Sequence, residues 1–364
     1  MAASAPLKLD IYPHILPRPY FERMQAIAAN DPALAGQLKR WVTVPVLHDL
    51  DARMRMMKRF PGYKQVLTLS MPPLEFLAGP EESPALARIA NDSMAEIVAQ
   101  HPDFFPAFVA SLPMNNVPAA LAEMDRALGT LGAKGVQVFT NVNGRALDEP
   151  EFFPVFERVS TRYDLPVWVH PARTARFADY PGEPKSKYEI WWAFGWPYET
   201  TAFMARMVFS QVLERLPKLR IITHHLGAMA PYFERRIRYG YDQFGSRTAD
   251  EDYGALLARM AKHPVEYFRT FLGDTAVNGS ASALRCGLDF FGARRVLFGT
   301  DCPFDPHGGP LFIRETIRAI DSLGLPRAER DGIYFGNALR ILRLRLPAAR
   351  PAAGRAPARR KARQ

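Results

Sequence analysis

The chain has 364 residues, of which 48% are hydrophobic and 23% charged. This length supports one large core, and α/β barrels commonly use it as a single domain. Two cysteines, Cys286 and Cys302, are too few for a disulfide framework. The first residues lack the apolar stretch of a secretory signal, and no uncharged apolar run of about 18 residues occurs. We therefore expect a cytoplasmic protein with no membrane span.

The formal net charge of +10 is concentrated at the carboxyl end of the chain. Residues 350–364 carry six basic side chains and no acidic one, which leaves a charge of +4 on residues 1–349. The composition of residues 347–364 predicts a disordered basic tail, and residues 1–346 are expected to form the folded domain. Contact between the tail and phosphates stays open, but the charge distribution argues against nucleic acid as the main partner.

Short apolar, β-branched runs alternate with longer segments of helical spacing, which predicts a parallel sheet covered by helices. Eight such runs occur, and eight is the number of strands in a (β/α)8 TIM barrel. The runs are 7–12, 64–70, 104–112, 135–140, 166–170, 219–225, 269–276 and 295–301. The clearest helices between them are expected at 83–100, 117–132 and 199–216.

Two stretches are longer than a minimal barrel requires. Residues 31–62 form an insertion after the first expected strand, and residues 171–198 form a long loop after the fifth. Long loops at the carboxyl ends of barrel strands are where substrate pockets are built. We expect both insertions to border the pocket.

Histidine and aspartate residues end several of the expected strands. His14, His170, His225 and Asp301 each fall at the end of a different run. A single histidine in such a position is more often structural, so the prediction depends on the joint pattern. Because these strand ends meet at one rim of a barrel, we expect the four side chains to surround one divalent metal ion, Zn or Mn.

Six segments of the chain resemble the amidohydrolase superfamily, in particular the branch that contains aminocarboxymuconate-semialdehyde decarboxylase and the resorcylate-type decarboxylases. The resemblance implies a (β/α)8 barrel with a metal at its rim, a small carboxylate as substrate and a homodimer. The segments are LDIYPHILP at 9–17, VWVHPAR at 167–173, FGWPYETT at 194–201, IITHHLGAMAPYFERRI at 221–237, LFGTDCPF at 297–304 and YFGNALRIL at 334–342.

The resemblance also implies a role for each strand-end residue. His14 and His170 match metal ligands of the first and fifth strands, and Asp301 matches the eighth-strand carboxylate that touches the metal and moves a proton. His225, before a Leu-Gly pair, matches the catalytic acid or base. The neighbouring His224 is then expected to be packed or to lie behind the ligands.

The first strand departs from the family pattern, which is usually His-x-His, because Tyr12 stands in the first of the two positions. A neutral phenol with a pKa near 10 is a poor ligand. Four arrangements stay open: three ligands from His14, His170 and Asp301; a Tyr12 phenolate as a further ligand; metal binding only together with substrate; or a metal-free site with Tyr12 as acid or hydrogen-bond donor.

Non-oxidative decarboxylation of an aromatic or unsaturated carboxylate is the reaction that the resemblance implies. The metal would stabilise developing charge while His225 or Asp301 protonates the carbon that loses CO2. The same residues suit hydrolysis of a C–N, C–O or C–C bond next to a carbonyl. A third interpretation, suggested by Tyr12, is a barrel that has lost catalysis and binds a ligand only.

The loop after the fifth expected strand supplies candidate substrate-binding residues. Arg173 follows His170 closely, and an arginine can hold a carboxylate through two parallel hydrogen bonds. Trp191, Trp192 and Trp196 crowd the same loop and could stack on a flat ring. Packing of these tryptophans onto the barrel rim or onto a partner subunit is an equally good interpretation.

Overall fold

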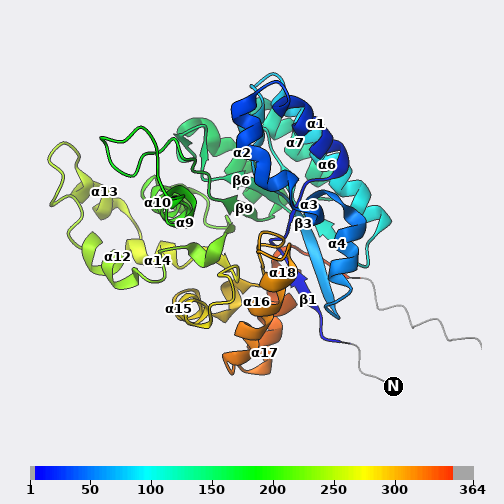
Figure 1. Cartoon of the computed structure of the whole chain (residues 1–364). Helices are drawn as coiled ribbons and strands as arrows, with labels where there is room; N and C mark the ends of the chain where they lie inside the picture. Colours follow the sequence, from blue (N-terminus) through cyan, green and yellow to red (C-terminus); the bar gives the residue numbers. More distant parts are fainter. Residues whose placement is uncertain (1–4, 347–364) are drawn as a thin grey trace, which may run out of the picture.

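Parallel strands form the centre of the molecule, which a computed structural model describes from residue 5 to residue 346 (Figure 1). One set of strands has the order β1-β3-β2, with β4 also paired to β3, and a second has the order β12-β11-β10-β9-β6-β5. The strands are β1 Lys8–Asp10, β2 His14–Ile15, β3 Tyr63–Leu69, β4 Ala107–Phe108, β5 Ala110–Ser111, β6 Val136–Phe139, β9 Val167–His170, β10 Ile221–Thr223, β11 Leu272–Asp274 and β12 Val296–Leu297.

Two seams join these sets into a closed barrel. At one seam, β4 and β5 are consecutive pieces of one strand, and Val109 between them donates a hydrogen bond of 2.9 Å to the Leu67 carbonyl. At the other, the Ile11 amide donates to the Phe298 carbonyl at 2.9 Å, and the Asp301 amide donates to the Tyr12 carbonyl at 3.2 Å. Each of the eight expected runs therefore contributes a strand, and the predicted (β/α)8 barrel is confirmed.

The barrel interior is filled by apolar side chains that alternate along the strands. Leu9, Val66, Val109 and Ile222 belong to one buried cluster with Trp168, whose side chain is fully buried. This filling matches the packed interior of a TIM barrel, in which inward residues from alternate strands stack in layers. The same cluster includes Ile341 and Leu342 of the last helical segment, so the carboxyl-terminal segment covers the amino-terminal end of the barrel.

The connection after the first strand is a helical excursion rather than an irregular loop, and it begins earlier than the expected residue 31. In Figure 1 its helices stack beside the later helices α6 and α7 on one side of the barrel. It consists of α1 Arg18–Ala28, α2 Pro32–Val42, α3 Pro45–His48 and α4 Leu50–Met57.

Helices of the middle and end of the chain cover the rest of the sheet. The expected helix 199–216 is two helices, because Gln211 between them adopts a left-handed φ of 61°. The remaining α-helices are α5 Leu74–Leu77, α6 Ser83–Gln100, α7 Val117–Gly129, α8 Phe153–Arg158, α9 Ile190–Ala193, α10 Gly195–Phe209, α11 Val212–Arg215, α12 Glu234–Tyr241, α13 Tyr253–Arg259, α14 Pro264–Phe268, α15 Ala281–Phe291, α16 Pro310–Ser322, α17 Arg327–Asp331 and α18 Asn337–Ile341.

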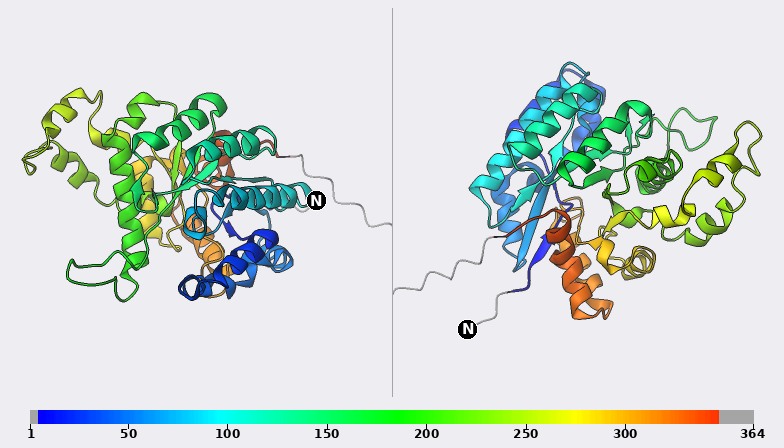
Figure 2. Two further views of the ribbon diagram at one scale, coloured as in Figure 1. Left: turned by 90° about the horizontal axis from the view of Figure 1, so that it is seen from above. Right: turned by 180° about the vertical axis from the view of Figure 1, so that it is seen from behind.

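Smaller elements complete the connections. A hairpin of β7 Asn141–Val142 and β8 Arg145–Ala146 follows β6. Short 3-10 or π turns lie at Pro150–Phe152, Val159–Tyr163, His225–Gly227, Ala293–Arg295 and Gly332–Gly336. The expected tail at 347–364 lies outside the described residues. In the views of Figures 1 and 2, α12 and α13 extend outward beyond α10. No helix among residues 5–346 is long and apolar enough to cross a membrane.

A buried carboxyl in α5 makes fold stability depend on pH. Glu75 is 6% exposed, one of its oxygens has no hydrogen-bond partner in the described structure, and burial raises its pKa to about 7. An unfolded chain restores the ordinary value of 4.5, so the folded protein binds more protons between these two values. The ionised carboxylate therefore destabilises the fold above pH 7, and this effect fades as the pH falls toward 4.5.

We predict that Glu75→Gln makes the protein more stable than wild type at pH 8, by roughly 1–3 kcal/mol. The difference should shrink as the pH is lowered through 7 toward 5, because the wild-type carboxyl then becomes neutral. Urea unfolding at several pH values measures this. The exposed Glu81→Gln is the matched control and should show no such trend. A Glu75→Gln advantage that stays constant with pH would contradict the assignment.

Candidate active site

Three histidines from different strands face one another at the carboxyl-terminal rim of the barrel. His14 lies in β2, His170 ends β9 and His224 follows β10 directly. Their ring centroids are separated by 5.2 Å for His14 and His170, 5.5 Å for His14 and His224, and 5.1 Å for His170 and His224. Each ring offers a nitrogen within 4.8 Å of those of the others, and none of the three residues is more than 2% exposed. This spacing suits coordination of a single ion.

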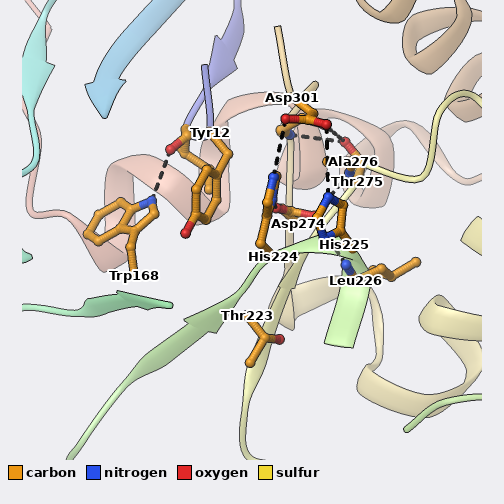
Figure 3. A network of polar contacts seen from close by, with 12 residues as sticks. Tyr12, Trp168, Thr223, His224, His225, Leu226, Asp274, Thr275, Ala276 and Asp301 are labelled. Atoms are coloured by element: carbon orange, nitrogen blue, oxygen red, sulfur yellow. Dashed lines mark hydrogen bonds and ion pairs between the residues drawn. The ribbon is translucent and has the colours of Figure 1, made fainter. Parts of the chain in front are cut away.

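Asp301 joins this group from the loop after β12 (Figure 3). Its Oδ1 lies 3.1 Å from His14 Nε2 and 3.5 Å from His224 Nε2, while its Oδ2 lies 3.9 Å from His225 Nε2. Burial acts to raise the pKa of Asp301, but its close contacts with His14, His224 and His225 outweigh burial and hold the pKa well below the ordinary value. Asp301 is therefore an ionised carboxylate shared by buried rings and by the more accessible His225.

The position of His224 differs from the sequence expectation. Its Nδ1 is hydrogen-bonded to Asp274 at the end of β11, and its Nε2 has no hydrogen-bond partner among the described residues. That Nε2 therefore faces the same space as His14 and His170 instead of packing behind the ligands. An aspartate at the end of the neighbouring expected strand, in the segment LGDT, was the available signal, because metal-bound histidines commonly donate their second N–H to a carboxylate.

His225 lies beside His224 although adjacent strand residues normally point to opposite faces. The chain leaves the strand at this point, since His225 and Leu226 both have a left-handed φ of 56°. Leu226 fills the space above Gly287, where an added Cβ would lie 2.3 Å from the leucine side chain. The two imidazole centroids end 3.9 Å apart, and the His225 side chain keeps 21% exposure. A sharp turn thus brings both histidines to the same pocket.

The electrostatics leave two of the three buried rings neutral. Burial lowers the pKa of His14, and burial together with the neighbouring histidines lowers the pKa of His170 well below 6.5. Near His170, the Pro171 carbonyl lies 2.8 Å from Nδ1, which fixes the proton there and leaves a lone pair on Nε2. Burial also opposes charge on His224, but the carboxylate of Asp274 prevails and raises its pKa to about 9.

These donors fit a divalent cation. Both ring nitrogens of His14 and the Nε2 of His224 are buried without a hydrogen-bond partner in the described structure. Such orphaned groups cost roughly 1–3 kcal/mol each when nothing satisfies them. A cation would satisfy one ring nitrogen of His14 and the Nε2 of His224 together, displacing the proton of His224, while Asp301 supplies an anionic oxygen. Imidazole and carboxylate ligands of this kind suit Zn or Mn.

Tyr12 forms a wall of the pocket. Its ring stacks on His224 at a centroid separation of 3.9 Å and an interplanar angle of 19°. The side chain is fully buried, and burial followed by the charges of Asp274 and Asp301 raises its pKa well above 10. The phenol is therefore neutral among these side chains alone. Within the described structure, the phenol at this position therefore does not replace the histidine ligand that the family pattern usually has here.

The helical excursion supplies a buried cation behind His14. Arg53 of α4 has no exposed surface and donates a hydrogen bond to the His14 carbonyl. It also donates to Gln65 Oε1 at 2.7 Å and to the Val46 carbonyl at 3.0 Å. Charge-assisted bonds of this kind are stronger than neutral ones. The excursion thus holds the backbone of His14 in place, a role that its sequence did not reveal.

The loop after β9 places its candidate residues unequally. Trp196 packs edge-on against His170 at 5.4 Å between centroids, and Trp191 packs against Trp196 at 5.8 Å. Arg173 is already paired with Glu199 at 2.9 Å. Trp192 is 42% exposed and donates its indole N–H to a glutamate of its own loop, outside the histidine group. Trp196 is the tryptophan in contact with the histidine group. The side chain of Arg173 pairs with Glu199.

Comparison with known proteins places this site in a family. Residues 14–344 match the family model described as amidohydrolase. The chain is 28% identical over 350 residues to 2-amino-3-carboxymuconate-6-semialdehyde decarboxylase of Dictyostelium discoideum, across 93% of this chain and 92% of that protein. It is 29% identical over 317 residues to gamma-resorcylate decarboxylase of a Polaromonas species, across 81% and 87%.

A solved structure shares the fold. The 5-carboxyvanillate decarboxylase of Novosphingobium aromaticivorans, solved with manganese and 4-hydroxy-3-methoxy-5-nitrobenzoic acid, superimposes with a TM-score of 0.79 at 21% identity. The match covers 94% of this chain and 98% of that chain. At this identity the likeness establishes the shared barrel and nothing finer.

The contact between Asp274 and His224 gives a prediction about metal affinity. Asp274→Asn keeps an oxygen for the backbone amides of Leu226 and Ala276 but removes the charge behind His224. We expect metal affinity to fall by about 10- to 100-fold, the usual effect of losing such a partner. Competition against a chelator measures it for Zn and for Mn.

Asp305→Asn is the control for this measurement. Asp305 is equally buried and also accepts two backbone N–H bonds, from His307 and Phe312, but it does not contact the histidine group in the described structure. Its substitution should leave metal affinity unchanged. Equal affinities for all three proteins would remove His224 from the set of ligands.

Proposed function

Because the chain belongs to the amidohydrolase family, we propose that it is a metal-dependent, non-oxidative decarboxylase of an aromatic or unsaturated carboxylate. One observation carries the proposal. Two of the three clustered buried imidazoles, His14 and His224, share the carboxylate of Asp301 with His225, which is 21% exposed. Groups suited to hold an ion thus lie next to a group able to move a proton. The two relatives described above are both named as decarboxylases.

The proposed ligands are His14, His170, His224 and Asp301. Manganese in the solved 5-carboxyvanillate decarboxylase supports a divalent ion, and the imidazole-rich ligand set suits zinc as well. When bound, the ion supplies a positive charge that holds the substrate's carboxylate or a neighbouring hydroxyl and stabilises negative charge there. The three buried rings keep water away from this charge, which strengthens every electrostatic interaction in the pocket.

His225 is the proposed proton donor. Its ring lies beside the shared carboxylate of Asp301 and its side chain is 21% exposed, so it can exchange protons with solvent and pass one inward. The proton adds to the carbon that bears the carboxylate, and the bond from that carbon to the carboxylate then breaks to release CO2. His225 regains a proton through its exposed side, while ionised Asp301 orients the ring through its second oxygen. Atoms balance with one proton consumed and one CO2 released.

The substrate is proposed to be a small, flat carboxylate. Trp196, in contact with His170, offers an aromatic wall, and Trp191 extends this wall outward. Arg173 would have to leave Glu199 to grip a carboxylate, so we assign it a role at the pocket edge. Trp192, with Tyr188 and Phe194, forms an exposed aromatic surface on this loop. We propose that these exposed aromatic side chains contact a second copy of the chain in the expected homodimer.

Substitutions at Tyr12 and His14 distinguish between the possible sets of metal ligands. We predict that Tyr12→Phe keeps metal content at the wild-type level, because the phenol is neutral and acts as a wall, whereas His14→Ala loses most of the metal. Elemental analysis of protein purified without added metal measures both. Tyr12→His should bind metal at least as tightly as wild type. Metal loss in Tyr12→Phe would instead make the phenolate a ligand.

His225 tests the reaction itself. His225→Asn should lower kcat for release of CO2 from a hydroxylated benzoate by about 10²- to 10⁴-fold and leave metal content unchanged. His263→Asn, at a distant pair with Asp242, serves as the control. In ¹⁸O-labelled water the arene product should carry no label. Incorporation of label into the product would identify a hydrolase, and an unchanged rate in His225→Asn would reject this residue as the proton donor.

A further inference from the structure

A basic cavity lies at the end of the barrel opposite the histidine group. Its volume is about 550 Å³, and residues at the beginning of three strands form part of its lining. Arg220 directly precedes β10, Leu272 is the first residue of β11, and Arg295 directly precedes β12. The candidate active-site residues follow the other ends of the same strands. The cavity is therefore a separate feature of the fold and not an extension of the active site.

Cations dominate the cavity lining. Six basic side chains line it against a single carboxylate, Glu214. That carboxylate is already engaged, because it accepts hydrogen bonds from the Tyr267 hydroxyl and from the Ala261 amide. The basic residues are Lys218, Arg220, Lys262, Arg294, Arg295 and Arg340.

Several of these cations lack anionic partners. Within residues 5–346, Arg294 and Arg295 make no ion pair, and the side chain of Arg340 bonds only to the Arg294 carbonyl and to Asn337. Arg220 is paired with Asp164, but its buried Nε has no partner in the described structure. Burial, and then the charges of Arg294, Arg220 and Arg295, lower the pKa of Arg340. Like charges are thus held together against their mutual repulsion, which an anion would relieve.

We propose that this cavity binds a small molecule that carries two or more phosphate groups. Arginine guanidinium groups match phosphate oxygens through paired hydrogen bonds, and several clustered arginines call for more than one negative charge. The volume lies within the usual range of small-ligand pockets, about 300–1,000 Å³. The cations line a hollow instead of a long surface stripe, and Tyr267, the only aromatic residue of the lining, is buried. Both features argue against a strand of nucleic acid, which needs an extended track with stacking platforms.

Titration of the full-length protein with inorganic tripolyphosphate, followed by calorimetry, tests the site. Wild type should bind saturably with one ligand per chain. The Arg294→Ala/Arg295→Ala variant should bind about tenfold more weakly or worse, because two unpaired cations are lost. Neither side chain makes a described hydrogen bond or ion pair, so the variant should unfold at the wild-type temperature.

Two controls separate the cavity from general basicity. Arg314→Ala/Arg318→Ala removes the same charge from the exposed face of α16. Arg359→Ala/Arg360→Ala removes it from the carboxyl-terminal sequence. Both should bind tripolyphosphate as wild type does. Equal binding by the cavity variant would overturn the proposal, and so would loss of binding in the carboxyl-terminal variant alone.

A second polyanion, single-stranded DNA, distinguishes a small-molecule site from a nucleic-acid site. A short single-stranded DNA should bind at least tenfold more weakly than tripolyphosphate at the same salt concentration. Tighter binding of the DNA, lost in the cavity variant, would replace the small-molecule proposal with a nucleic-acid one. Decarboxylase activity plays no part in these measurements, so the outcome is independent of the proposed reaction.

Discussion

The closure of the sheet between its first and last strands is the constraint on which the site depends. Asp10 carries this seam: its carboxylate accepts the backbone amides of Tyr12 at 3.0 Å and of Thr300 at 3.2 Å. The Tyr63 hydroxyl donates to the same group at 2.5 Å, and burial raises the pKa of Asp10 to about 6. Through these bonds the start of the chain and the segment before Asp301 are fixed to each other. His14 Nε2 and Asp301 Oδ1, far apart in sequence, are thereby held 3.1 Å apart.

The protonation states of the rings explain why the histidine group can be so deeply buried. Three imidazoles cluster without mutual repulsion only if most of them are neutral, and burial lowers the pKa of both His14 and His170. The exception, His224, has its charge matched by Asp274. The barrel thus prepares lone pairs at its rim before any ligand arrives, and the rigid strand ends prevent the rings from turning toward other partners.

The fold and part of the site were readable from the sequence because both depend on strand ends. Apolar runs of strand length located all eight strands, and the last residue of a run marks the rim of a parallel barrel. What the pattern could not resolve was the direction of adjacent side chains. His224 faces the same pocket as His225 because the backbone turns left-handed between strand and loop, where Leu226 packs against Gly287. The contribution of Arg53 was equally hidden, since it depends on how a helical insertion folds back over the barrel.

Charge balance gives a reason why tyrosine is tolerated at the first strand. In the proposed metal site, a divalent ion among neutral imidazoles and one ionised aspartate would keep one positive charge, and Asp274 behind His224 would offset that charge at longer range. A histidine at position 12 would add a neutral ligand, so its replacement by a neutral phenol changes the number of ligands but not the charge of the centre. Attraction for an anionic substrate depends on charge, whereas the number of open positions depends on ligand count. Tyr12 is thus expected to leave the attraction for an anionic substrate unchanged and to free one coordination position for that substrate. The residue that stacks on His224 therefore also affects the chemistry at the rim of the barrel.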